Sequence, residues 1–185
     1  MTPAHGRPAV FLDRDGVLTE AFVRDGVPRP PRTLAEFRVL PGVTQACAAL
    51  RQAGFVLVVV TNQPDIARGT QTRAEVEQMN ERLRRLVPLD EVCVCPHDDA
   101  DGCSCRKPRP GMLLDAADRL DLDLARSAGV GDRWRDVEAA LRAGVTAIHV
   151  DRHYDEPPPV GAHVVVADLP EAATWMRAQA WAPKG

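Results

Sequence analysis

Two aspartates, two positions apart, follow the first apolar run of the chain. Residues 9–12 are apolar, and Asp13, Asp15 and Gly16 come next. Side chains alternate along a strand, so both carboxylates point the same way, and Gly16 lets the chain turn away. Such a pair can supply a nucleophile and an acid, or bind a divalent cation. A simple turn is the alternative, because Asp and Gly are common turn residues.

Other polar residues follow later apolar segments of the chain. Because ligands of open parallel sheets bind at the carboxyl ends of the strands, we expect these side chains to meet Asp13 and Asp15 at one edge. They are Thr61 and Asn62, Arg106 and Lys107, and Asp132 with Asp136. Each alone has an ordinary interpretation as a cap or surface residue, but together they indicate a site.

A short loop concentrates cysteines beside a histidine. Three thiolates and an imidazole at this spacing form a tetrahedral zinc set, with no open position, so we predict a structural zinc that holds the loop 95–105. The predicted ligands are Cys95, His97, Cys103 and Cys105. Cys47 lies on a helical apolar stripe, and it and Cys93 are expected in the core.

Strands and helices alternate around these residues. The patterns predict strands at 8–13, 55–60, 91–95, 127–130, 145–150 and 163–166. They predict helices at 43–53, 72–86, 110–120, around 137–143 and at 170–180, with Leu86 and Leu141 facing inward. Residues 19–41 are expected to form an irregular loop that carries Arg24, Arg29 and Arg32. This order predicts one α/β domain over 1–185, with a parallel sheet covered by helices on both faces.

The composition narrows the kinds of partner. A net charge of −3 gives no electrostatic case for nucleic acid or an anionic membrane, and 4% aromatic residues leave little for base stacking. No stretch approaches the roughly 20 apolar residues of a membrane span, and residues 1–8 lack the core of a signal peptide. We therefore expect a soluble cytoplasmic protein, and separately we expect a monomer.

Four motifs appear in the order typical of one enzyme superfamily. They are DRDGV at 13–17, TNQ at 61–63, RKP at 106–108 and GDRWRD at 131–136. The chain thus resembles the haloacid-dehalogenase-superfamily phosphatases, which implies a Rossmann-like domain that here lacks room for a large cap.

The resemblance also implies roles for the motif residues. Asp13 is the expected nucleophile, and Asp15 the expected general acid and base. Thr61 and Lys107 are expected to stabilise the transferring phosphoryl group. Mg²⁺ is expected on Asp13, the Asp15 backbone carbonyl and Asp132. Asp136 is a second candidate near the metal.

The cysteine loop resembles that of two phosphatase groups within this superfamily. The segment 66–69 (IARG) is similar to the heptose 1,7-bisphosphate 7-phosphatases, whereas the arginine in GDRWRD is similar to the histidinol-phosphatases. We predict a small phosphorylated metabolite as substrate, most simply the heptose bisphosphate, contacted by Asn62, Arg68 and Arg106. Histidinol phosphate or another small sugar phosphate, a phosphotransferase reaction and a non-catalytic zinc-stapled binding domain are the alternatives.

Overall fold

A single parallel sheet organises the computed structural model, which describes residues 6–179. Its strands lie in the order β5-β4-β1-β6-β7-β8, and every neighbouring pair is parallel. The strands are β1 (Ala9–Leu12), β4 (Val56–Asn62), β5 (Glu91–Cys95), β6 (Ala128–Gly131), β7 (Thr146–Val150) and β8 (Val164–Val166). The α/β prediction is confirmed, with each predicted strand within two residues of its observed bounds.

The central strands are buried on both faces because their side chains alternate between two apolar clusters. Val10 and Leu12 of β1 pack into one cluster, and Ala9 and Phe11 pack into the other. β4 repeats this alternation. A polar residue inside such a strand would cost free energy, so the polar side chains collect where the strands end.

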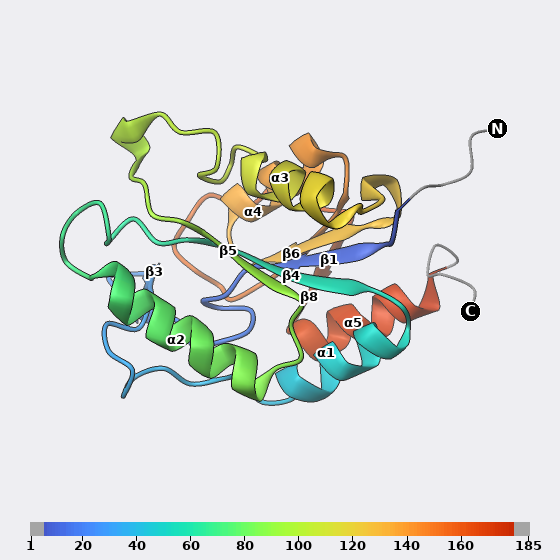
Figure 1. The fold of residues 1–185 in the computed structure, drawn as a ribbon, viewed down its shortest axis with the longest axis horizontal. Coiled ribbons are helices and arrows are strands. Elements are labelled where there is room, and N and C mark those ends of the chain that lie inside the picture. The colour runs from blue at the N-terminus through green and yellow to red at the C-terminus, as the bar shows by residue number, and fades with distance from the viewer. Residues whose placement is uncertain (1–5, 180–185) are drawn as a thin grey trace.

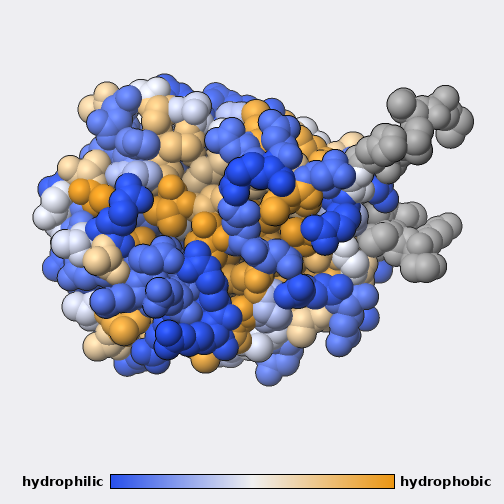
Figure 2. Space-filling model, in the orientation of Figure 1, coloured by the Kyte–Doolittle hydropathy of each residue, from blue (hydrophilic) through white to orange (hydrophobic). Residues whose placement is uncertain are grey.

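Helices cover both faces of the sheet (Figure 1). α1 (Val43–Gln52), α2 (Arg73–Leu86) and α5 (Leu169–Ala178) contribute to one apolar cluster, and α3 (Gly111–Leu120) and α4 (Trp134–Ala143) contribute to the other. The predicted end of the last helix, Ala180, lies outside the described residues. Figure 2 shows apolar side chains near the middle of one face and mostly hydrophilic ones around them.

The segment between β1 and α1 is more regular than predicted. It contains an antiparallel hairpin, β2 (Phe22–Arg24) and β3 (Val27–Arg29), turned by Asp25 and Gly26 with φ of 53° and 74°. Asp-Gly favours a hairpin turn with two positive φ values, but the neighbouring prolines favoured the prediction of an irregular loop. The prediction of an irregular loop was wrong here.

Three predicted core side chains lie closer to solvent. Leu86 and Leu141 are 46% and 38% exposed, because each stands at the margin of its helix's apolar stripe. Cys93 is half-buried on β5, an edge strand, whereas Cys47 is fully buried as predicted. Among the described residues, no helix has the length and apolar character needed to cross a membrane.

Two leucines of α2 give a matched test of this packing. Leu83 is fully buried in the cluster that also holds Met79, whereas Leu86, three residues on, is 46% exposed. We expect Leu83→Ala to lower the free energy of unfolding by about 2–5 kcal/mol. Leu86→Ala should cost less than about 1 kcal/mol, since little apolar area leaves contact. Urea denaturation of both variants measures the difference, and equal losses would contradict this packing.

Candidate active site

Three carboxylates meet at the carboxyl edge of the sheet. Asp13 follows β1, Asp132 follows β6, and Asp136 lies in the first turn of α4. Each offers an oxygen, and these atoms lie within 4.8 Å of one another. Parallel strands end at the same edge, which is why residues 119 positions apart come together.

Two glycines make this close approach possible. A Cβ at Gly16 would lie 1.8 Å from Asp132 Oδ2, and one at Gly131 would lie 2.0 Å from Asp136 Cβ. Any larger residue would push the acids apart. Gly16 also has a φ of 96°, which L side chains rarely adopt.

One buried lysine joins the acids. Lys107 Nζ donates to Asp13 Oδ1 at 2.7 Å and to the Val60 carbonyl at 2.7 Å, and it pairs with Asp136 Oδ1 at 2.5 Å. The Asn62 side chain holds the lysine's backbone, accepting from its N–H and donating to its C=O, both at 3.1 Å. Both polar groups of this predicted substrate contact are thus used to position Lys107.

The cluster has more negative than positive charge. Burial raises the pKa of Asp13 to about 6, while Lys107 opposes this change and Asp136 adds to it. Burial, with the charges of Asp13 and Asp136, also raises the pKa of Asp132 well above its usual range. Asp132 Oδ1 is buried without a hydrogen-bond partner among the described residues. Three carboxylates against one ammonium, with an unpartnered oxygen, form a donor set that fits Mg²⁺.

Asp15 is held apart from this cluster. Arg14 Nη2 donates to its Oδ2 at 2.9 Å, Gln63 Nε2 donates to the same oxygen at 2.8 Å, and Thr19 Oγ1 donates to Oδ1 at 3.0 Å. Gln63 also donates to Thr61 Oγ1 at 2.9 Å. The Asp15 carboxylate therefore has a fixed orientation, and both Asp15 and Thr61 line the same pocket.

Sequence reasoning missed Arg14, which is fully buried and reaches Asn80 Oδ1 of α2 at 2.9 Å. Its guanidinium also lies 5.8 Å from the centre of the Phe37 ring. Arginine is rarely buried, so its position inside a motif gave no sign of this role. Sequence reasoning also gave no role to Gln63, the third residue of the TNQ motif.

A pocket of about 230 Å³ opens above Asp13, Asp15 and Thr61. Its rim is rich in arginine, with two acids, Asp65 and Asp99, among them. The arginines are Arg29, Arg68, Arg106, Arg133 and Arg135. Of the predicted loop arginines, Arg29 alone lines this pocket, because β3 carries it there.

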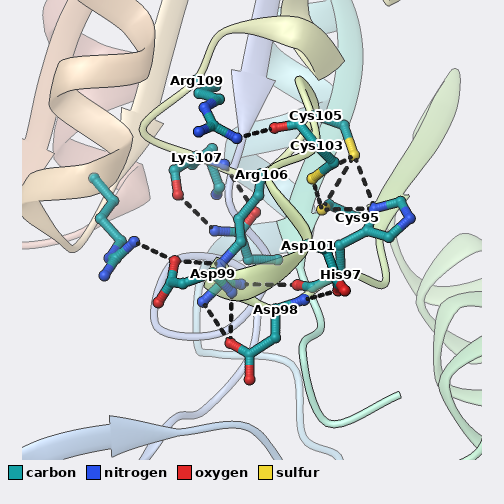
Figure 3. A network of polar contacts seen from close by, with 12 residues as sticks. Cys95, His97, Asp98, Asp99, Asp101, Cys103, Cys105, Arg106, Lys107 and Arg109 are labelled. Carbon is teal, nitrogen blue, oxygen red and sulfur yellow. Dashed lines mark hydrogen bonds and ion pairs between the residues drawn. The ribbon is translucent and has the colours of Figure 1, made fainter. Parts of the chain in front are cut away.

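The cysteine loop anchors three of these arginines, Arg68, Arg106 and Arg135, and Figure 3 shows Arg106 beside Asp98 and Asp99. Asp98 accepts from Arg68 Nε at 2.6 Å and from Arg68 Nη2 at 2.8 Å. Asp99 accepts from Arg106 Nε at 2.8 Å. The predicted substrate contacts Arg68 and Arg106 are therefore positioned by consecutive acids of the loop.

The predicted zinc ligands converge in the same loop (Figure 3). Cys105 Sγ lies 3.2 Å from Cys95 Sγ, 3.4 Å from Cys103 Sγ and 3.3 Å from His97 Nδ1. Thiolates about 2.3 Å from a tetrahedral zinc stand slightly farther apart than this. Three sulfurs and one imidazole nitrogen in this arrangement fit a zinc ion, and Cys93 stays outside the cluster.

Comparison with known proteins identifies the family. A family model described as haloacid dehalogenase-like hydrolase matches residues 30–144, more than half of the chain. The chain belongs to this hydrolase family. Two D-glycero-beta-D-manno-heptose-1,7-bisphosphate 7-phosphatases, from Bordetella bronchiseptica and Escherichia coli K12, are each 41% identical to it, over 143 and 152 residues. These alignments cover 73% and 75% of this chain and 75% of each relative.

A solved structure of the same family has a similar fold. The D,D-heptose 1,7-bisphosphate phosphatase of B. bronchiseptica, complexed with magnesium and phosphate, gives a TM-score of 0.78 at 36% identity. The match covers 91% of this hydrolase and 97% of that chain. The prediction of a phosphatase of this family is confirmed, and the magnesium in that structure supports Mg²⁺ as the cation for the acid cluster.

The buried charge predicts a pH-dependent stability of the magnesium-free protein. The folded-state pKa of Asp13, about 6, lies above its usual 3.8, so ionising it in the folded protein is unfavourable. Stability should therefore fall as the pH rises from about 4 to above 6. At pH 8, Asp13→Asn should be more stable than the wild type by about 1–3 kcal/mol, and this gain should vanish near pH 4.

Denaturation in magnesium-free buffer at both pH values measures this effect. Asp118→Asn, a change of an exposed aspartate on α3, is the control and should alter stability little at either pH. An Asp13→Asn protein less stable than the wild type at pH 8 would contradict the charge imbalance.

Proposed function

We propose that this hydrolase is a Mg²⁺-dependent phosphomonoesterase that removes the 7-phosphate of D-glycero-D-manno-heptose 1,7-bisphosphate. The arginine rim above Asp13 carries the proposal. Hydrolysis at one phosphate requires a nucleophile at the pocket floor, and recognition of a bisphosphate requires cationic groups farther out. The names of the relatives support this substrate. The chain is proposed to act as one domain, monomeric and cytoplasmic.

The proposed reaction has two steps. In the first, an oxygen of Asp13 attacks phosphorus, the bond from phosphorus to the ester oxygen breaks, and Asp15 donates a proton to the leaving alcohol. In the second, Asp15 accepts a proton from water, whose oxygen attacks phosphorus and frees Asp13 and inorganic phosphate. The attack on phosphorus requires that the Asp13 carboxylate be unprotonated. Its hydrogen bond from the Lys107 ammonium favours this ionised form.

The remaining site residues are proposed to stabilise or position. We propose that Lys107 neutralises charge on the transferring phosphoryl group and that the Thr61 hydroxyl donates a hydrogen bond to it. Asp13, Asp132 and the Asp15 backbone carbonyl would hold Mg²⁺, which would supply further positive charge to the phosphoryl oxygens. Asp136 is proposed to hold Lys107 through their 2.5 Å ion pair. Arg68, Arg106 and Arg133 are proposed to contact the substrate, and Asn62 to hold Lys107 in place.

A substrate comparison tests this function. The ratio kcat/KM for the heptose bisphosphate should exceed that for histidinol phosphate, because histidinol carries positive charge toward the arginine rim. Phosphate release from both substrates measures the ratio, and a higher value for histidinol phosphate would overturn the heptose assignment. Asp13→Asn should release no phosphate from either substrate. Retained activity in that variant would overturn the nucleophile.

The cysteine loop is proposed to hold a structural zinc through Cys95, His97, Cys103 and Cys105. Its place in the chain supports this, because Cys105 directly precedes Arg106 and Lys107. A closed tetrahedral site would fix the backbone that carries both cations. Zinc would then affect catalysis through their positions and not through contact with the substrate.

A pair of cysteine variants tests the zinc site. Cys105→Ala should lose bound zinc and lower kcat/KM, since the backbone of Arg106 and Lys107 is no longer held. Cys93→Ala, ten residues from Cys103 along the chain and outside the cluster, is the matched control and should keep its zinc. Elemental analysis of the purified variants gives the zinc content. Equal zinc in both variants would contradict the ligand set.

A further inference from the structure

The segment that follows β7 is fastened to several parts of the active site. Arg152 Nε donates to the carbonyl of Gly16, in the turn after Asp15, at 2.9 Å. The Asp155 N–H donates to the carbonyl of Gly26, at the tip of the β2–β3 hairpin, at 3.0 Å. Glu156 forms an ion pair with Arg133. Residues 151–156 thus join the first motif, the hairpin and the fourth motif.

Tyr154 lies in the middle of this segment. Its hydroxyl donates to Asp132 Oδ2 at 2.7 Å. A Cβ at Gly16 would come within 2.9 Å of the Tyr154 hydroxyl as well as 1.8 Å of Asp132 Oδ2. The space left by this glycine is therefore filled by the contact between Tyr154 and Asp132.

The backbone around Tyr154 fixes the direction of its side chain. His153 has a φ of 56°, an unusual value for a residue with a side chain. Its N–H donates to Asp151 Oδ1 at 2.8 Å, which stabilises the turn. With Arg152 and Asp155 anchored on either side, the phenol is held against Asp132 before any ligand binds.

The two oxygens of Asp132 are in different environments. Oδ2 accepts the Tyr154 hydrogen bond, whereas Oδ1 is buried and has no partner within residues 6–179. A phenol donor carries no charge, so it orients a carboxylate without competing with a cation for the negative charge. Lys107, in contrast, places its charge on Asp13 and Asp136.

We propose that Tyr154 is a positioning residue that holds the Asp132 carboxylate with one oxygen free for Mg²⁺. This inference rests on the magnesium site of the proposed function. Tyr154 acts through Asp132 and contacts neither the reacting atoms nor the cation. Without the Tyr154 hydroxyl, the Asp132 carboxylate can rotate. Binding of Mg²⁺ must then restrict this rotation.

Calorimetric titration of Mg²⁺ into the substrate-free protein tests the role of Tyr154. Tyr154→Phe removes one oxygen and keeps the ring. The dissociation constant for Mg²⁺ should rise about 10-fold, the scale expected when a hydrogen-bond partner of a metal ligand is lost. The Mg²⁺ concentration for half-maximal phosphate release should rise in parallel, and kcat at saturating Mg²⁺ should stay within about 2-fold.

A control in the same turn isolates the hydroxyl. His153→Asn changes an exposed side chain to one that tolerates positive φ, and its Mg²⁺ affinity should equal that of the wild type. Unchanged Mg²⁺ affinity in Tyr154→Phe would overturn the inference. So would a weaker affinity accompanied by a lower unfolding temperature in magnesium-free buffer, because the hydroxyl would then be stabilising the loop.

The proposed metal site can fail separately. Asp132→Asn should abolish measurable Mg²⁺ binding to the substrate-free protein. Binding that survives in Asp132→Asn would overturn the metal site of the proposed function, whatever the result for Tyr154→Phe.

Discussion

The buried ammonium of Lys107 is the interaction on which the rest of the site depends. It is 4% exposed and balances Asp13 and Asp136, which would otherwise repel each other in a desolvated pocket. Without it, burying these acids would be strongly unfavourable. Three features hold Lys107 in place. The Asn62 amide hydrogen-bonds its backbone, the Val60 carbonyl accepts a hydrogen bond from Nζ, and the cysteine loop directly precedes it in the chain.

The parallel sheet explains how distant segments supply this cluster. Register pairs β1 with β4 and β6, so the chain leaves these three strands at one edge. The same geometry allowed the meeting of Asp13, Thr61, Lys107 and Asp132 to be predicted, because a strand's end can be recognised from where its apolar run stops. The meeting of Cys95, His97, Cys103 and Cys105 was predictable for a different reason, since residue type and spacing alone define that cluster.

The side-chain contacts that the sequence did not reveal join segments distant in the chain. No periodic pattern of residues marks these contacts. Arg14 was not recognised as buried, because its partner Asn80 lies 66 residues away on another element. Tyr154 lies in an irregular segment, where neither spacing nor residue type indicates that its hydroxyl reaches Asp132. Leu86 shows a different limit. An apolar stripe on a helix predicts which side chains face the core, but it does not show where the neighbouring elements end and leave a side chain exposed.

The two acids of the first motif therefore differ because of what surrounds them. Asp13 lies among carboxylates and one ammonium, which suits a group that shares its charge with a cation. Asp15 is turned toward Arg14, Thr19 and Gln63, outside that cluster. Asp13 and Asp15 are identical side chains two residues apart, but they face different charges. Such differences in environment allow one carboxylate to act as a nucleophile and the other to transfer protons. The division of labour proposed for them was implied by the family resemblance, and these contacts support it.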